Sequence, residues 1–173
     1  MERCVDALKR WTGKSKPTII FDSTVDEFTN DCLFQKVRGK PNVAIVATTT
    51  DGDVFGGFYS VAVTERLKDE NLFDPNMFAF SFESHGRCET PKRFAVKKKF
   101  KVDAGVAFFF KNDSDMPFVE FYGGGGEFFL GNEKTETWCY NLSDCFKNVE
   151  NTTLTGKNCG RPSCCRFVVS QLE

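Results

Sequence analysis

Phenylalanine is the feature that most limits what this sequence can fold into. Twenty of the 173 residues are Phe, against 2 Trp and 3 Tyr. Many of these rings stand at alternating positions, as in Met77-Phe78-Ala79-Phe80-Ser81-Phe82. A period of two is typical of β-strands, because successive side chains of a strand point to opposite faces of a sheet. We therefore expect a core of packed sheets filled with aromatic rings.

Short strand-like segments recur along the chain with turn residues between them. Asp51-Gly52, between the segments 43–50 and 54–63, is the strongest hairpin signal. The polar segment 64–75 is expected to be a loop. Further strands are expected over 17–21, 77–82, 94–96, 106–110, 118–122, 127–130, 137–140 and 166–169.

Helical signals are confined to the first 40 residues. Val5, Leu8 and Trp11 have helical spacing and predict a short amphipathic helix. Residues 23–26 resemble a capping box that begins a second helix, which ends near Gly39. The pattern as a whole predicts one domain over 1–173 of mainly β (α+β) class. Its architecture is a two-sheet antiparallel β-sandwich flanked by a few short helices.

The charge balance excludes some classes of partner. The chain has 23 basic and 24 acidic residues, a formal net charge of −1. A near-neutral chain is not drawn as a whole to nucleic acid or to anionic membranes, so no nucleic-acid partner and only indirect membrane contact are expected. The first residues contain no apolar signal segment, and no apolar run reaches the length of a membrane span. We expect a cytoplasmic protein.

A catalytic site is not expected. His85 is the only histidine, and it lies in a turn with no nucleophile paired to it by the sequence, which favours an exposed loop residue. The glycines 123–126 lack the Lys and Ser or Thr of a phosphate loop and predict a sharp bend between strands. Neither a cofactor nor an enzyme activity is therefore expected.

Eight cysteines in a chain without a secretion signal are expected to be reduced. A zinc cluster of Cys139, Cys145, Cys159 and Cys164 is conceivable, but the spacing lacks the usual tight pair, and separate buried thiols are favoured, so no metal is expected. Reactive thiols need an electropositive, partly exposed setting. Cys88 and Cys165 each stand beside an arginine and are the candidate reactive thiols.

The segment 87–101 holds seven cations against a single acid, Glu89. A solvated hairpin is the favoured interpretation, and a surface for an acidic partner or anionic lipid is the alternative. The candidate partner patch consists of Arg87, Lys92, Arg93, Lys97, Lys98, Lys99 and Lys101.

The order of the segments resembles the TLDc domain (TBC/LysM-associated domain) of oxidation-resistance type proteins, over nearly the whole chain. The most specific parts are the hairpin Asp51-Gly52-Asp53-Val54-Phe55-Gly56-Gly57-Phe58 and the strand Asp74-Pro75-Asn76-Met77-Phe78-Ala79-Phe80-Ser81-Phe82. Family members commonly carry a glycine where Glu27 stands. The residues that form the structural signature are Asp22, Ser23, Gly56, Gly57, Asp74, Gly123 and Gly124.

This resemblance implies a non-enzymatic protein-interaction domain of the oxidative-stress response, which binds or regulates the vacuolar proton-pumping ATPase. It also places Gly56 and Gly57 in a core strand, where we expect large side chains to pack across the bare backbone. The alternative function is a cysteine-based redox protein that consumes or senses oxidant. A hydrolase using Asp22 and Ser23 is the least favoured, because capping of the second helix explains both residues.

Overall fold

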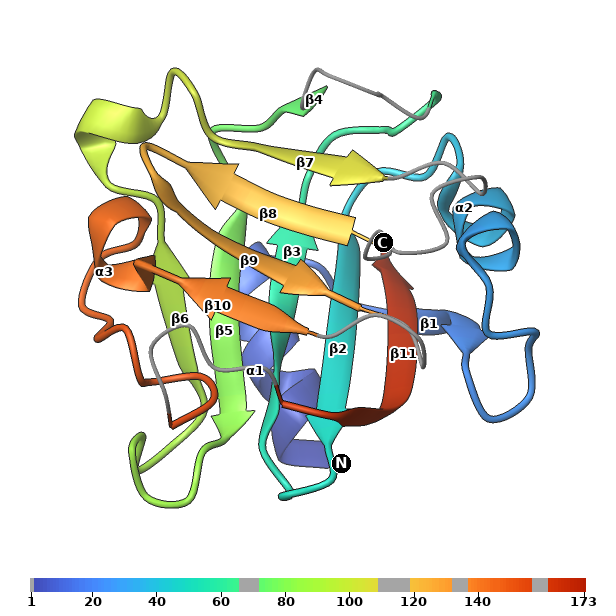
Figure 1. Ribbon diagram of the computed structural model, residues 1–173. Helices are drawn as coiled ribbons and strands as arrows, with labels where there is room; N and C mark the ends of the chain where they lie inside the picture. Colours follow the sequence, from blue (N-terminus) through green and yellow to red (C-terminus); the bar gives the residue numbers. More distant parts are fainter. Residues whose placement is uncertain (1, 66–71, 109–118, 132–136, 157–161) are drawn as a thin grey trace.

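The computed structural model describes residues 2–65, 72–108, 119–131, 137–156 and 162–173. Two antiparallel sheets face each other, which confirms the expected sandwich (Figure 1). The first sheet has the strand order β1 (Pro17–Asp22), β11 (Cys164–Leu172), β2 (Val43–Thr49), β3 (Val54–Tyr59), β5 (Phe78–Glu83) and β6 (Lys92–Ala95). The second has the order β10 (Trp138–Tyr140), β9 (Gly126–Leu130), β8 (Val119–Gly123), β7 (Gly105–Phe108) and β4 (Leu72–Phe73).

Helices are short and flank the sheets. The helical elements of the described residues are α1 (Glu2–Thr12), α2 (Asn30–Val37), α3 (Leu142–Cys145) and the 3-10 turn η1 (Lys98–Phe100). In Figure 1, α1 lies behind the six-stranded sheet and α2 beside its β1 end. The first helix was predicted correctly from its apolar spacing.

The second helix begins later than the sequence pattern predicts. α2 starts at Asn30, and the side chain of Thr29 caps its first turn. The capping box expected at 23–26 is wrong, because the Ser23 hydroxyl instead accepts the backbone N–H of Phe167, 2.9 Å away. The Ser23 hydroxyl, which the local pattern assigns to a helix cap, therefore bonds to strand β11 instead.

Strand limits also differ from the predicted segments. The hairpin at Asp51-Gly52 is confirmed, but β3 ends at Tyr59 rather than at 63. The expected loop 64–75 contains the two-residue strand β4, which pairs with β7. Parts of the strands expected over 106–110 and 118–122, and half of that loop, lie outside the described residues.

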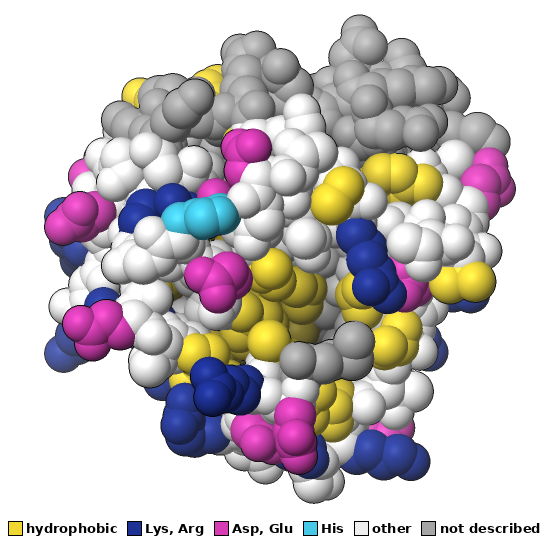
Figure 2. All heavy atoms as spheres, turned by 90° about the horizontal axis from the view of Figure 1, so that it is seen from below, with side chains coloured by type: hydrophobic (Ala, Val, Ile, Leu, Met, Phe, Trp, Pro, Cys, Tyr) yellow, Lys and Arg dark blue, Asp and Glu magenta, His cyan; other side chains and the backbone are white. Residues whose placement is uncertain are grey.

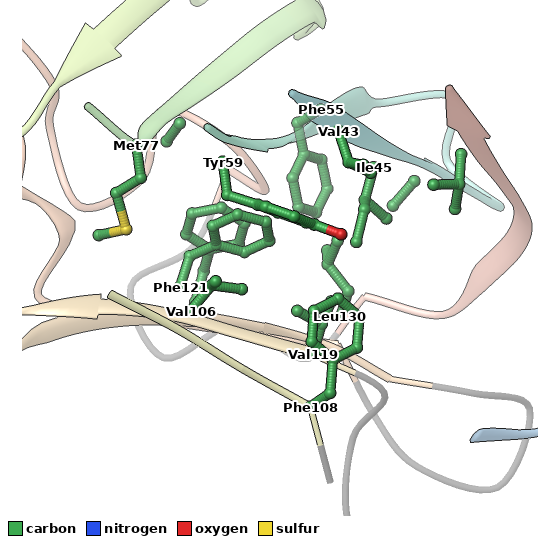
Figure 3. Packing of buried hydrophobic residues seen from close by; sticks show 14 of the residues in the cluster. Val43, Ile45, Phe55, Tyr59, Met77, Val106, Phe108, Val119, Phe121 and Leu130 are labelled. Atoms are coloured by element: carbon green, nitrogen blue, oxygen red, sulfur yellow. The ribbon is translucent and has the colours of Figure 1, made fainter. Parts of the chain in front are cut away.

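The core lies between the two sheets and is dominated by rings (Figure 3). Phe121 and Phe128 of the second sheet stack with their centroids 4.8 Å apart and an interplanar angle of 8°. Tyr59 of the first sheet points into the same space, and its buried hydroxyl has no hydrogen-bond partner among the described residues. Burial raises the pKa of this phenol far above its ordinary value.

The paired glycines of β3 have a steric explanation. A Cβ added to Gly57 would lie 2.5 Å from two carbons of the Phe121 ring. A Cβ added to Gly56 would collide with the backbone carbonyl of Ile45 on the neighbouring strand. Gly57 therefore admits a ring from the opposite sheet, as expected from the sequence, whereas Gly56 admits the neighbouring backbone, which was not expected.

Candidate functional site

The outer face of the six-stranded sheet is only partly covered. Helix α1 packs Leu8 against one half of this face, over residues Ala44, Phe58, Phe78, Phe80 and Leu172. Trp11 stacks on Phe82 with ring centroids 5.9 Å apart and an interplanar angle of 7°. The other half of the face remains open beside the helix.

A hollow of about 300 Å³ occupies this open half. Its apolar lining includes Val5, Leu8, Val46, Val54, Phe82 and Val168, from α1 and four strands. Figure 2 shows hydrophobic side chains gathered in a hollow on the face seen from below, with charged side chains around it. Arg166 and Ser170 are the hydrogen-bonding side chains of the lining. The surface suits apolar groups and offers one cation at its edge.

That cation is held by a carboxylate. The guanidinium of Arg166 donates to both oxygens of Asp22, with Nη2–Oδ2 at 2.5 Å and Nε–Oδ1 at 3.2 Å. The backbone N–H and the hydroxyl of Thr24 donate to the same carboxylate. The Arg166 hydrogen bond, above all, holds the pKa of Asp22 well below its usual range. Asp22 is thus a structural anion rather than a helix cap, which corrects the sequence interpretation.

The other signature residues are dispersed through the fold. Asp74 is fully buried and accepts the hydroxyl of Ser60 at 2.8 Å and the backbone N–H of Asn76 at 2.9 Å. Gly123 and Gly124 belong to the tight turn between β8 and β9. Gly124 has a φ of 61°, and a Cβ there would collide with the ring of Phe100. The structure does not bring these residues together in one site, and each has a local structural role.

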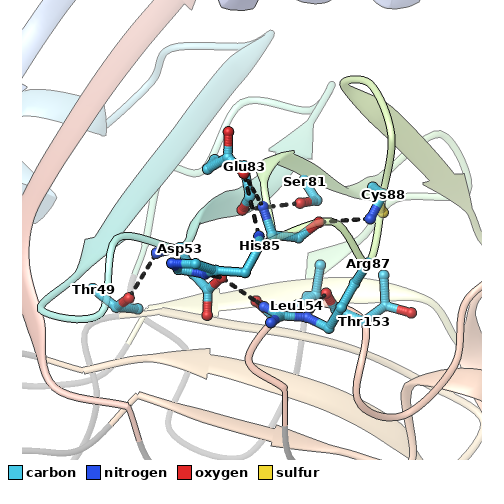
Figure 4. Close-up of polar contacts among 10 residues, drawn as sticks. Thr49, Asp53, Ser81, Glu83, His85, Arg87, Cys88, Thr153 and Leu154 are labelled. Atoms are coloured by element: carbon cyan, nitrogen blue, oxygen red, sulfur yellow. Dashed lines mark hydrogen bonds and ion pairs between the residues drawn. The ribbon is translucent and has the colours of Figure 1, made fainter.

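A polar cluster that the sequence did not reveal joins two loops (Figure 4). The side chain of Asp53 is 5% exposed, and one of its oxygens lies 2.8 Å from His85 Nδ1 and 2.6 Å from Arg87 Nη2. Arg87 also donates to the carbonyl oxygens of Thr153 and Leu154. His85 is thus the exposed loop residue that was expected, and its ring is in addition bonded to Asp53. No local signal marks this cluster, because the pairing of β3 with β5, which sets Val54 against Glu83, brings the two loops together.

An aspartate that orients a histidine is one half of a hydrolytic site. The second half, a hydroxyl or thiol bonded to the other ring nitrogen, is absent among the described residues. His85 is about half exposed, and its ring lies 3.7 Å from a Cβ built on Gly52. The cluster fastens the β2–β3 turn, the turn after β5 and the segment around Leu154 to one another.

Most cations of the basic segment are exposed, as expected for a solvated surface, but they do not form one patch. Arg87 is turned inward, as described above. Arg93 donates to the carbonyl oxygen of Trp11 at 2.8 Å and lies over the ring of Phe78. Lys97 donates to the carbonyl oxygen of Ser143 at 2.5 Å. Arg93 is nevertheless exposed, as are Lys92 on the edge strand β6 and Lys98, Lys99 and Lys101 in and after η1.

The cysteines of the described residues differ in how deeply they are buried. Cys139 and Cys145 are buried, and desolvation raises the pKa of Cys145 to about 12. Cys88 is half-buried against the core, whereas Cys165 is exposed with its Sγ 3.4 Å from the carbonyl oxygen of Thr48. No group of three or more metal-ligating side chains occurs in the described ranges. Cys159 of the conceivable zinc cluster lies outside them.

Comparison with known proteins adds no assignment: no family model matches the sequence, and no curated protein is significantly similar to it. None of the helices within the described residues is both long and apolar enough to cross a membrane.

Proposed function

We propose that this chain is a non-enzymatic protein-interaction domain of the oxidative-stress response, which works in the cytoplasm and receives apolar side chains of a protein partner in the hollow beside α1. The observation that carries the proposal is the lining of that hollow, which is apolar apart from Arg166, Ser170 and the thiol of Cys4. None of the three groups is a nucleophile hydrogen-bonded to a base within the described residues, and burial raises the pKa of the Cys4 thiol, so the hollow suits recognition rather than reaction. Apolar anchor residues of a partner commonly bind in pockets of this kind.

The edge of the hollow favours a polypeptide as its occupant. The side chain of Arg166 is 42% exposed while Asp22 engages its Nε and Nη2. Its Nη1 can donate to a backbone carbonyl oxygen of a segment whose apolar side chains lie in the hollow. Because Asp22 already neutralises the guanidinium, a neutral carbonyl suits this position better than a second carboxylate. A partner helix or extended segment supplies both groups.

The sequence resemblance to the TLDc domain makes the vacuolar proton-pumping ATPase the first partner to test. The test compares the wild-type chain with Val54→Lys, which places a charge in the hollow. Glu83, the register partner of Val54, offers that lysine an opposite charge, so the variant should fold. Val25→Lys is the matched control, because Val25 is 83% exposed and does not line the hollow.

Purified pump subunits should bind the wild type and the control alike, and should bind Val54→Lys at least tenfold more weakly. Thermal unfolding of all three proteins shows that the comparison is made between folded chains. If no pump subunit binds the wild type, the pump is the wrong partner. If binding is equal for wild type and Val54→Lys, the hollow is not the docking surface.

A cysteine-based redox function is the second candidate, and the exposed thiol of Cys165 is the observation that favours it. Its neighbour Arg166 is neutralised by Asp22, which reduces the positive field that a thiolate needs. Peroxide consumption by the wild type and by Cys165→Ser tests this function. Consumption no faster than that of a free thiol, or unchanged in the variant, rules it out.

A further inference from the structure

Three lysines and one valine project from the turn between β6 and β7. We call Lys98, Lys99, Lys101 and Val102 the lysine tip. All four are exposed, and Val102 is 74% exposed. In Figure 1 the coil of η1 lies at one extreme end of the molecule.

The backbone of the tip is fixed although its side chains are exposed, and the Lys99 ammonium lies 4.4 Å from the centroid of the Phe100 ring. Phe100 donates its N–H to Lys97 O at 3.0 Å, and Asp103 donates its N–H to Phe100 O at 3.0 Å. The ring of Phe100 packs over Gly124, where a Cβ would collide with it. The tip is therefore anchored to the β8–β9 turn and presents its lysines in one place.

A second exposed apolar side chain lies at the same end. Phe73 of β4 is 51% exposed, and its register partner is Gly105, the first residue of the strand that follows the tip. The bond from the Asp74 N–H to Ala104 O, 2.8 Å long, fixes this arrangement. Two of the five large hydrophobic side chains that are exposed among the described residues thus belong to the tip or to the strand paired with the start of β7.

We infer that the lysine tip binds an anionic membrane surface. Lysines are hydrated point charges that need no fixed geometry, and near anionic lipid head groups each one strengthens binding about fivefold. Exposed apolar side chains such as Val102 and Phe73 add affinity when they enter the boundary between head groups and acyl chains. A purely electrostatic contact with an acidic protein gives Val102 no role, so the combination favours lipid.

The inference concerns local charge and is compatible with the formal net charge of −1. Within the tip and its anchor, Asp103 is the acidic residue opposing Lys97, Lys98, Lys99 and Lys101. Surface potentials are screened within about 8–10 Å at physiological salt, so a local cluster decides the contact. The hollow beside α1 appears on the face seen from below, whereas η1 lies near the upper end of Figure 1. A membrane-bound chain therefore leaves the hollow open, and this inference goes beyond the proposed function.

Vesicle co-sedimentation of the full chain tests the inference. Phosphatidylcholine vesicles with phosphatidylserine should bind the chain, and vesicles of phosphatidylcholine alone should not. Changing the three tip lysines together to Gln should weaken binding about 100-fold, at about fivefold for each lysine. A matched control changes the exposed cations Arg3, Arg10 and Lys16 to Gln and alters the net charge equally. The control should bind like the wild type.

Val102→Asn separates lipid from an acidic protein surface without altering charge. We expect it to weaken binding to the anionic vesicles roughly fivefold, because a buried valine contributes apolar transfer energy. Binding that this variant leaves unchanged overturns the membrane assignment in favour of an acidic protein surface. Absence of binding to anionic vesicles, or equal losses in the two triple variants, also overturns it. None of these outcomes bears on pump binding by Val54→Lys.

Discussion

Adding a single methyl group at Gly57 should destabilise the fold measurably. In Gly57→Ala the new Cβ lies 2.5 Å from the Phe121 ring, well inside van der Waals contact. The ring cannot retreat easily, because it is fully buried and stacked on Phe128, whose ring is 6.0 Å from that of Phe146. Overpacking of this kind costs about 1–3 kcal/mol. Alanine recovers about 0.4–1 kcal/mol by restricting the unfolded chain.

The expected net loss is about 1–2 kcal/mol, which corresponds to a Tm lower by roughly 2–4 °C for each kcal/mol in a chain of this size. Urea unfolding measures it directly. A double-mutant cycle with Phe121→Leu isolates the steric cause, because the smaller side chain makes room for the methyl group. The double variant should be more stable than the sum of the single variants by about 1 kcal/mol. Additive losses, or a Gly57→Ala variant as stable as the wild type, would refute the close-contact explanation of this glycine.

Three further predictions concern titrating and reactive groups. The pKa of Asp22 lies well below its ordinary value of about 3.9, so the stability that its bond to Arg166 contributes is present above about pH 4 and is lost as the pH falls further. Asp22→Asn should therefore be less stable by about 1–2 kcal/mol at neutral pH, and its urea midpoint should change less than that of the wild type on acidification. Burial, followed by the nearby charge of Glu127, raises the pKa of Glu120 to about 7. Its stabilising protonated form is lost as the pH rises through that value, so Glu120→Gln should be more stable than the wild type at about pH 8 but not at about pH 5. Maleimide should label Cys165 in the folded chain far faster than the buried thiols, and Cys165→Ser should lose the rapid phase.

Local sequence patterns were sufficient to predict the class of fold and the positions of most strands. Alternation of apolar residues marked β2 and β5, and the Asp51-Gly52 turn marked their neighbouring hairpin. The order of the strands could not be derived in this way. β11, the last strand, lies between β1 and β2 and pairs Val168 with Val46 across more than a hundred residues. Such pairing depends on the packing of the whole sheet, and it cannot be predicted from the residues of one short segment.

Side-chain partners were the least predictable part. The cation run at 87–101 is largely a solvated surface, as its polar sequence neighbours predict. Arg87, Arg93 and Lys97 nevertheless donate to backbone carbonyl oxygens of remote segments. Asp53 and His85 meet only because β3 and β5 pair in one register. Carbonyl acceptors have no residue-type signature, so contacts of this kind cannot be predicted from the types of residue in a sequence.

The geometry of α1 explains why the sheet keeps an open apolar surface. A helix of 11 residues is about 16 Å long at 1.5 Å per residue, whereas the nine residues of β11 extend about 30 Å. One such helix cannot cover the whole outer face. The covered half carries the rings of Phe58, Phe78 and Phe80, and the open half is lined largely by valines from β2, β3 and β11. Each Å² of apolar surface that stays in contact with water loses about 25 cal/mol of the stabilisation that burial would give. A chain that needed only to fold would gain by polar residues at these open positions, so their apolar character is the physical reason to expect a partner there.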